Sequence, residues 1–287
     1  MFGPTSRALE GNQAWWESLS RSSRGTEIRG SAKTAGLRLY AMTCGWLTGD
    51  LGSMLAGREG TIRFPVPAYL IEHPKGRVLF DTGMHPNSPF DPHGQIGDLA
   101  SAFSVEIRPG EDVKARLENL DIDAGRIEYV INSHLHFDHT GGNELVPNAR
   151  IIIQEREWEA GQVPELIKAN AFNPLNYEHG HLVRRVNGEY DLFGDGSVVT
   201  VPTFGHTPGH QSLKVKLNSG TVILAADACY FRHSLENLHL PGIVYDRAQM
   251  MNSLLLLRRL QRAGARIFYG HDPEFWEQVP QAPLQVT

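Results

Sequence analysis

Residues 133–142 read SHLHFDHTGG, and they follow directly after the apolar run RIEYVIN. The apolar run predicts a buried strand, because it is short and rich in β-branched and aromatic side chains. In an extended segment, side chains two positions apart point to the same side, so His134 and His136 can face one point. If the chain then turns into a helix, Asp138 and His139 lie in its first turn and face the same pocket. Imidazole and carboxylate are ligands that zinc-like divalent metals prefer, so this stretch predicts a metal site.

Three more candidate ligands stand near the ends of other apolar runs. His206, Asp227 and His271 each follow a run that predicts a strand. A single histidine in such a place is more often a hydrogen-bonded structural residue. Together with the first cluster, however, the three bring the set to five histidines and two aspartates. That set is too large for one tetrahedral ion and fits two metals that share a bridging carboxylate.

The rest of the chain predicts a layered α/β protein. Short apolar runs predict further strands at residues 37–43, 61–71, 77–81, 150–154, 197–203, 211–217, 221–226 and 266–269. Helical spacing predicts helices at residues 111–120 and 247–263, the second with Asp246 as its N-cap and Gly264 as its stop. Strands grouped before and after central helices favour an αββα sandwich, with two mixed β-sheets flanked by helices, over a regular βαβ alternation.

Two segments carry a weaker pattern. Residues 1–35 are rich in serine, arginine and glycine, and we expect an N-terminal extension that is partly ordered if Trp15 and Trp16 pack on the body. Residues 36–287 are expected to form a single domain. Within it, residues 44–60 combine several glycines with apolar side chains. This mixture predicts a lid or binding loop, or else an ordinary loop packed on the core.

The composition argues against several classes of partner. The chain has 27 Lys+Arg against 32 Asp+Glu, a net charge of −5, which disfavours a nucleic-acid partner. Two cysteines, Cys44 and Cys229, cannot build a disulfide framework and suit a reducing compartment. Neither a secretory signal nor a membrane-spanning apolar run is visible. We therefore expect a cytoplasmic protein without a membrane or nucleic-acid partner.

These motifs resemble those of the metallo-β-lactamase-fold hydrolases, and within them the chain is most similar to the N-acyl-homoserine lactonases, which are quorum-quenching enzymes. The similarity covers roughly residues 37–276. It lies in HLHFDHTGG, in GHTPGHQSL, in Asp227 followed three residues later by Tyr230, and in the closing Gly270-His271-Asp272. The resemblance implies that residues 36–287 are the catalytic domain of a metal-dependent carboxylic ester hydrolase with the αββα fold.

The resemblance also implies two divalent metal ions held by seven side chains. One ion would be bound by His134, His136 and His206. The other would be bound by Asp138, His139 and His271. Asp227 would bridge both ions, whereas His210 matches a structural position. The metal is expected to be zinc, although iron, cobalt or manganese fits the same ligands.

The implied reaction is the opening of the lactone ring of N-acyl-homoserine lactones to N-acyl-homoserines, by attack of a metal-bridging hydroxide. Asp138 would carry the proton, and Tyr230 would donate a hydrogen bond to the carbonyl oxygen. An acyl chain needs an apolar trough. Its candidate residues are Phe137, Trp46, Leu47 and Met54. Each ligand histidine is expected to donate its other N–H to a carboxylate or carbonyl, with Asp81 and Asp272 as candidate acceptors.

Alternatives remain on the same scaffold. Another lactonase, or a glyoxalase-II-like thioesterase, shares all seven ligands, although such thioesterases normally carry a helical domain after the last ligand. A non-catalytic binding protein would be expected to lack some ligands, and all seven are present. The sequence leaves the preferred acyl length open, and it fits a monomer or a homodimer.

Overall fold

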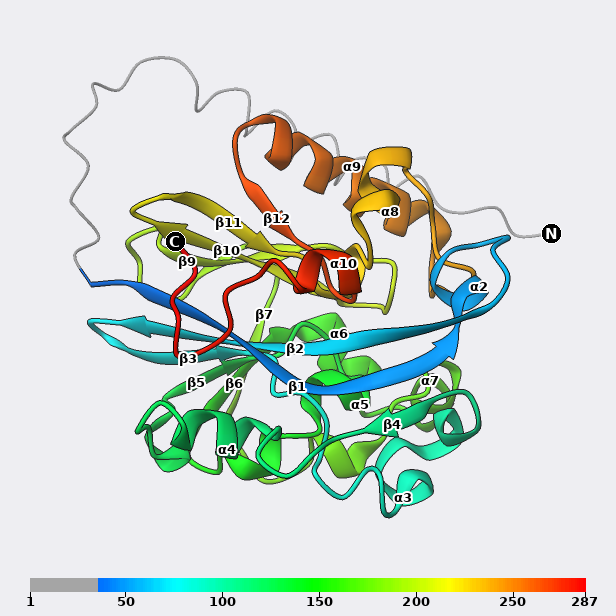
Figure 1. The fold of residues 1–287 in the computed structure, drawn as a ribbon, viewed down its shortest axis with the longest axis horizontal. Helices are drawn as coiled ribbons and strands as arrows, with labels where there is room; N and C mark the ends of the chain where they lie inside the picture. The colour runs from blue at the N-terminus through cyan, green and yellow to red at the C-terminus, as the bar shows by residue number, and fades with distance from the viewer. Residues whose placement is uncertain (1–35) are drawn as a thin grey trace. The chain divides into compact units, whose positions relative to one another are not determined.

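A computed structural model describes residues 36–287, so the expected extension over residues 1–35 lies outside the described residues. Two β-sheets face each other, and helices cover the outer face of each sheet (Figure 1). The predicted αββα sandwich is therefore confirmed. Within the described residues, no helix has the length and apolar character needed to cross a membrane.

The first sheet has seven strands in the order β4-β1-β2-β3-β5-β6-β7. Their bounds are Ser104–Glu106, Arg38–Asp50, Thr61–His73, Gly76–Phe80, Tyr129–Ile131, Arg150–Gln154 and Val183–Val186. Strands β4, β1, β2 and β3 pair antiparallel, whereas β3, β5, β6 and β7 pair parallel. The sheet is thus mixed, as the sequence predicts.

The second sheet has five strands in the order β12-β11-β10-β9-β8. Their bounds are Arg266–Phe268, Gly220–Leu224, Gln211–Leu217, Val198–Pro202 and Tyr190–Asp191. Only β11 and β12 pair parallel. Because β11 and β12 run side by side in the same direction, Asp227 and His271 leave the sheet at the same edge.

The helices are short, apart from α9 (Arg247–Arg262). The other α-helices are α2 (Leu51–Met54), α3 (Pro92–Ile96), α4 (Val113–Glu118), α5 (Phe137–Thr140), α6 (Glu155–Ala160), α7 (Pro164–Ala169), α8 (Arg232–Asn237) and α10 (Pro273–Trp276). The 3-10 helices are η1 (Gly97–Ser101), η2 (Ala124–Arg126), η3 (Asn143–Leu145), η4 (Pro174–Asn176) and η5 (Ala226–Ala228). The predicted N-cap of α9 is confirmed, since the Asp246 carboxylate accepts from the backbone N–H groups of Ala248 and Gln249.

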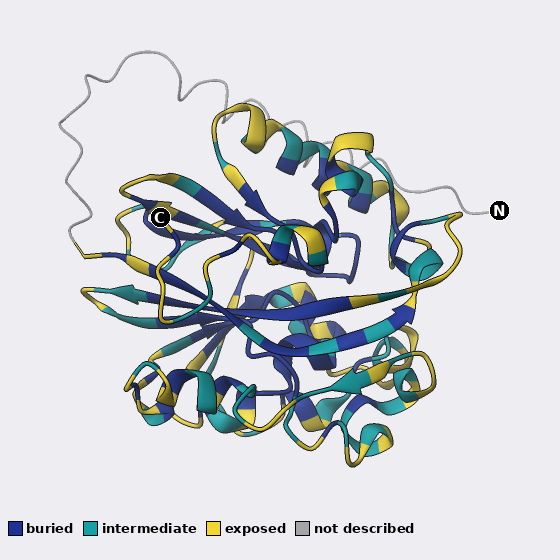
Figure 2. Ribbon diagram, viewed as in Figure 1, coloured by how far each residue is buried: buried dark blue, intermediate teal, exposed yellow. Residues whose placement is uncertain are grey.

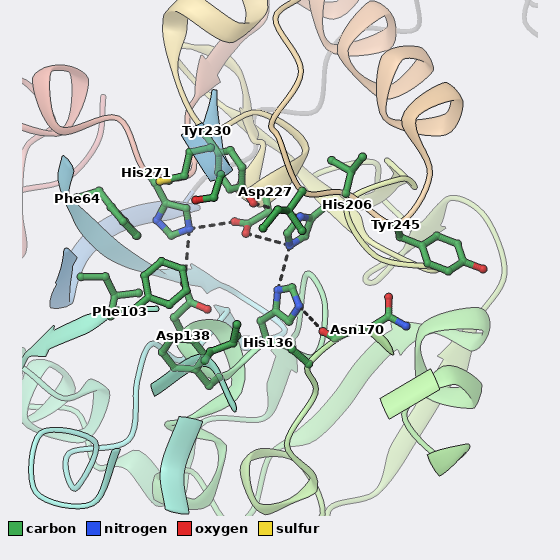
Figure 3. Close-up of a pocket in the computed structure, with 18 of the residues that line it drawn as sticks. Phe64, Phe103, His136, Asp138, Asn170, His206, Asp227, Tyr230, Tyr245 and His271 are labelled. Carbon is green, nitrogen blue, oxygen red and sulfur yellow. Dashed lines mark hydrogen bonds and ion pairs between the residues drawn. The ribbon is translucent and has the colours of Figure 1, made fainter. Parts of the chain in front are cut away.

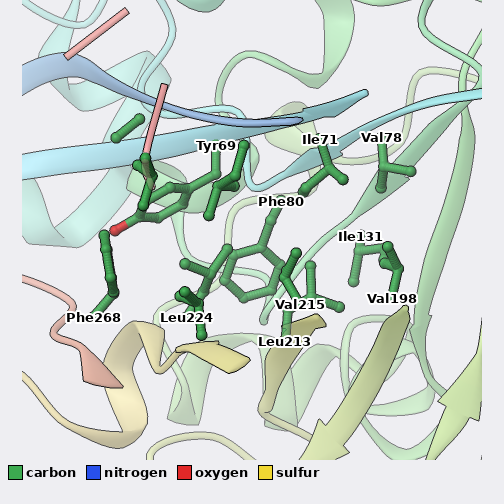
Figure 4. Packing of buried hydrophobic residues seen from close by; sticks show 14 of the residues in the cluster. Tyr69, Ile71, Val78, Phe80, Ile131, Val198, Leu213, Val215, Leu224 and Phe268 are labelled. Atoms are coloured by element: carbon green, nitrogen blue, oxygen red, sulfur yellow. The ribbon is translucent and has the colours of Figure 1, made fainter. Parts of the chain in front are cut away.

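Alternation along the strands builds the core between the sheets. In β2, Tyr69 and Ile71 face the second sheet, whereas Leu70 faces the helical layer that includes α4. The central parts of the facing strands are buried, and the strand ends are partly or fully exposed (Figure 2). Phe80 lies at its centre, against Leu213 and Leu224 of the second sheet (Figure 4).

Residues 44–60 differ from the loop that the sequence predicts. Strand β1 continues to Asp50, pairs with β2 over most of its length, and is followed by α2. The pairing shifts register between Thr43 and Trp46, and Gly45 in this bulge has φ 108°, a conformation that suits glycine. Gly45 and Gly49 therefore mark a bulge and close packing within a strand, whereas Gly57 and Gly60 lie in the turn before β2 with φ values of 75° and 111°. The prediction of a loop is thus wrong for residues 44–54, which form a strand and a helix.

Phe80→Ala should lower the free energy of unfolding by about 3–5 kcal/mol, because it removes a large side chain from the centre of the inter-sheet core. Phe90→Ala is the matched control, since Phe90 is 86% exposed, and should change that free energy by less than about 0.5 kcal/mol. Denaturant unfolding of the two variants measures both values. Equal losses in the two variants would contradict this assignment of the core.

Candidate metal centre

The candidate ligands gather where strands of both sheets end. His134, His136, Asp138 and His139 follow β5, and α5 begins directly after His136. His206 lies between β9 and β10, Asp227 follows β11 in η5, and His271 follows β12. The structure thus brings all seven side chains together, in two groups of facing ligand atoms. Figure 3 shows several of them around one cavity.

The first group consists of three histidines whose ring nitrogens face one point. The Nδ1 atom of His136 lies 2.9 Å from His134 Nε2 and 3.0 Å from His206 Nε2. His134 Nε2 and His206 Nε2 are 3.2 Å apart. Burial lowers the pKa of all three imidazoles, so they are neutral and each can offer a lone pair. Three converging neutral imidazoles match the donor set of a zinc-type site.

The second group consists of Asp138, His139 and His271. Asp138 Oδ2 lies 3.4 Å from His139 Nε2 and 3.6 Å from His271 Nε2. Asp227 lies between the two groups. Its Oδ1 is 3.1 Å from the Nε2 atoms of both His139 and His271, whereas its Oδ2 is 3.2 Å from His206 Nε2. One carboxylate therefore presents one oxygen to each group, which is the arrangement of a bridging ligand.

The donor set fits two divalent cations. Six buried side-chain polar atoms of the described residues have no hydrogen-bond partner, and two of them, His139 Nε2 and Asp227 Oδ1, face each other in this site. Buried polar atoms are rarely left so, and a bound cation would satisfy both. Burial disfavours the charged form of His139, but Asp227, Asp138 and Asp81 outweigh it and raise the pKa of His139 well above its usual value. The same negative potential attracts cations.

The second ring nitrogen of each candidate ligand is held by a neighbour. His139 Nδ1 donates to Asp81 Oδ2 at 2.8 Å, which confirms the predicted contact of Asp81. His271 Nδ1 donates to the Pro65 carbonyl at 2.8 Å, and His136 Nε2 donates to the Asn170 carbonyl at 2.8 Å. His134 Nδ1 lies 2.9 Å from Ser133 Oγ. These contacts set the ring orientations and leave the facing nitrogens free to bind a cation.

The expected support from Asp272 is wrong. Its carboxylate accepts from the backbone N–H groups of Arg232 and Phe275, so it caps α10 and holds the start of α8. The residue precedes a helix, and the carboxylate satisfies the free N–H groups of that helix instead of the neighbouring imidazole.

His210 and Cys229 lie near Asp227 but outside the ligand set. His210 Nε2 accepts the backbone N–H of Asp227 at 3.1 Å, and its Nδ1 lies 2.9 Å from Thr203 Oγ1. Burial lowers the pKa of His210 to about 3, so the ring stays neutral and holds the Asp227 backbone. Burial raises the pKa of the Cys229 thiol, which lies 3.3 Å from the Phe231 carbonyl. Neither side chain is placed as a ligand.

A cavity of about 210 Å³ opens beside the ligands. Its apolar wall includes the expected residues Leu47, Met54 and Phe137, and sequence reasoning missed Phe64, Leu99, Ile243, Val244 and Tyr245. The structure does not bring Trp46 to this cavity. Neighbouring residues of a strand point to opposite faces, and the Trp46 ring packs under the Arg63 guanidinium, 3.9 Å from the ring centre.

Backbone hydrogen bonds tie one wall of the cavity to the ligand loop. The N–H of Tyr245 donates to the His206 carbonyl at 3.1 Å, and the N–H of Gly242 donates to the Ser53 carbonyl at 3.0 Å. Residues 242–245 thus connect α2 with the His206 loop, while Ile243 and Tyr245 remain 73% and 48% exposed at the mouth.

Comparison with known proteins identifies the superfamily to which this fold belongs. The family model described as the Metallo-beta-lactamase superfamily matches residues 61–271. That range contains all seven candidate ligands and most of both sheets. The chain therefore belongs to the metallo-beta-lactamase superfamily.

Similar individual proteins identify the family within this superfamily. The chain is 34% identical to the N-acyl homoserine lactonase AttM of Azorhizobium caulinodans over 256 residues, which cover 86% of this chain and 97% of that protein. It is 34% identical to an N-acyl homoserine lactonase of a Bacillus species over 215 residues, 73% of this chain and 82% of that protein. The solved structure of an N-acyl homoserine lactone hydrolase with N-hexanoyl-L-homoserine at its metal centre has a TM-score of 0.78 and 27% identity, covering 87% of this chain and 98% of that one. The chain belongs to the family of N-acyl homoserine lactonases.

Asp227→Asn should reduce the number of divalent ions bound per chain from two to at most one, because the amide replaces one of the two facing oxygens and removes the negative charge. Elemental analysis of purified protein counts the ions. Asp272→Asn is the control, since that carboxylate caps a helix beside the site and contacts no candidate ligand. Two ions retained in Asp227→Asn would rule out a bridging role.

Proposed function

We propose that this protein is a metal-dependent hydrolase that opens the lactone ring of N-acyl homoserine lactones and so acts in quorum quenching. The observation that carries the proposal is the Asp227 carboxylate between two ligand groups, at the floor of an apolar cavity. Its relatives named N-acyl homoserine lactonase align over most of the chain. A cavity with a mainly apolar wall beside buried polar ligands suits a substrate with a small polar head and an apolar tail.

In this proposal His134, His136 and His206 hold one divalent ion, and Asp138, His139 and His271 hold the other, with Asp227 between them. Zinc is the proposed metal because five imidazoles and two carboxylates suit it, and iron, cobalt or manganese accepts the same donors. When bound, such a pair of ions supplies hydroxide at neutral pH and stabilises the negative charge that develops on the substrate.

Asp138 is proposed to move the proton. Its side chain is almost fully buried, and it lies at the cavity wall beside His271. Burial alone would raise its pKa, but His139 and His271 keep the pKa of Asp138 below its usual value, so the carboxylate is ionised and can accept a proton. The alkoxide that leaves when a lactone ring opens is a strong base and needs a proton, which Asp138 can return.

Tyr230 is proposed to hydrogen-bond the carbonyl oxygen of the lactone. Its hydroxyl lies 3.2 Å from His206 Nδ1. Because His206 Nε2 faces the other ligands, the ring proton belongs on Nδ1 and is donated to the phenol oxygen. The phenol hydrogen faces the Asp227 carboxylate, and its donation to the lactone oxygen would replace that contact. Burial, and then the charges of Asp227 and Asp138, raise the pKa of Tyr230 well above its usual value, so this hydrogen is retained.

Leu47, Met54 and Phe137 are proposed to contact the acyl chain, since all three line the cavity. We also propose a cytoplasmic location, which the free, buried thiols of Cys44 and Cys229 support. The proposed partner is the small lactone alone. Both a monomer and a homodimer are compatible with this proposal.

Tyr230→Phe should lower kcat for lactone opening by about 10²–10³-fold, because it removes one donor to the developing oxyanion, and it should retain two metal ions. A pH-stat assay with a chelator-treated sample as blank measures the rate, and S-lactoylglutathione serves as the comparison substrate. Turnover of the thioester in preference to lactones would contradict the proposed function, and an unchanged rate in Tyr230→Phe would remove Tyr230 from the reaction.

Met54→Ala should raise KM for a long-chain lactone more than for a short-chain one, because each methylene that loses apolar contact weakens binding by up to about 0.8 kcal/mol. Trp46→Phe is the matched control on the neighbouring strand, since its ring packs on Arg63 outside the cavity. Steady-state kinetics on a series of acyl lengths provides the comparison. The same change in KM at every acyl length would show that Met54 does not contact the acyl chain.

A further inference from the structure

One buried carboxylate outside the ligand set connects two of the ligand loops. Glu157 lies in α6 and is 0% exposed. Its Oε1 accepts the backbone N–H of Leu135 at 3.1 Å. Its Oε2 accepts the hydroxyl of Thr207 at 2.9 Å and the backbone N–H of Gly209 at 2.7 Å. A single side chain thus receives three hydrogen bonds from two segments far apart in the sequence.

The two segments carry one complete group of ligands. Leu135 stands between His134 and His136, and Thr207 directly follows His206. The second group is held by other contacts, since His139 donates to Asp81 and His271 donates to the Pro65 carbonyl. Glu157 therefore contacts backbone and side-chain groups directly beside all three histidines of the first group. Asp138 and His139 follow on the same segment as Leu135, but the His139 ring is held by Asp81.

The packing around Glu157 is close. A Cβ atom on Gly209 would lie 2.3 Å from the Glu157 backbone nitrogen, so only glycine lets the His206 loop approach α6 to this distance. Such contact fixes the separation between helix and loop. The loop cannot move toward α6, and the two hydrogen bonds to Oε2 keep it from moving away.

The choice of a carboxylate here needs a reason, because burial of a charge is costly. Burial raises the pKa of Glu157 to about 7, against the opposing effect of its three hydrogen bonds. A glutamine of the same shape has one acceptor oxygen and an NH₂ group, which would face at least one of the three donors. Only an ionised carboxylate accepts on both oxygens without presenting a hydrogen.

We propose that Glu157 is a positioning residue that sets the spacing of His134, His136 and His206, and thereby controls the metal affinity of that half of the centre alone. The inference rests on the two-metal centre of the proposed function. If Glu157 were merely structural, its replacement would lower global stability and weaken metal binding in both halves of the centre equally. If Glu157 is a positioning residue, its replacement weakens metal binding in one half only.

The test uses protein produced with cobalt, whose visible spectrum reports ligand geometry. The metal-loaded protein is dialysed against graded chelator at mildly alkaline pH, where the Glu157 carboxylate is ionised. Elemental analysis counts the ions retained per chain. The visible spectrum shows which of the two cobalt ions has been released, because the two ligand groups differ in geometry. The variants are Glu157→Gln and Thr207→Val, and the control is Glu159→Gln, an exposed glutamate on the same helix.

Glu157→Gln should release one of its two ions at about 10–100-fold lower chelator concentration, with the second ion released as in the unaltered protein. Thr207→Val removes one donor and should give a smaller shift of the same ion, and Glu159→Gln should give none. Thr207→Val decides the matter if Glu157→Gln does not fold.

Two results would overturn the inference: release of both ions as in the unaltered protein, or an equal shift of both. If the unaltered protein binds fewer than two ions or opens no lactone, the proposed function fails instead. The two failures are therefore distinguishable.

Discussion

The structure depends on keeping one ionised carboxylate, that of Asp227, in a place from which water is almost excluded. Burial opposes its ionisation, and the surrounding histidines, His139 foremost, hold its pKa well below the usual value. The buried negative charge of Asp227 stays favourable only while the surrounding histidines keep their positions. The backbone of Asp227 is accordingly held by His210, whose ring is itself held by Thr203. The arrangement trades stability for a site that attracts cations.

The two sheets supply the rigidity that this arrangement requires. Strands β5, β11 and β12 deliver ligands from their carboxyl ends, and the inter-sheet core around Phe80 fixes the distance between the sheets. Ligands from both sheets meet only at this distance. A change in the packing between the sheets would therefore change the distance between His136, which follows β5, and Asp227, which follows β11.

Sequence alone predicts most of the metal centre, because HLHFDH encodes its geometry locally, through strand alternation followed by a helical turn. Glu157 carries no such signal, since it acts mainly through backbone N–H groups that every residue type offers. Trp46 and Leu47 show a second limit: which neighbour faces the cavity depends on the register after the bulge at Gly45, and the glycines there favour a loop over the strand that forms. Adjacency to His271 suggests Asp272 as an acceptor, but its carboxylate caps α10 instead.

In the cavity wall formed by residues 242–245, the backbone and the side chains have different roles. Its backbone is anchored at both ends, to Ser53 and to His206, while the side chains of Ile243 and Tyr245 extend freely into the mouth. Replacement of those side chains reshapes the entrance without displacing the anchored main chain. The entrance can therefore be altered by substitution at Ile243 and Tyr245 while the candidate metal ligands below keep their places.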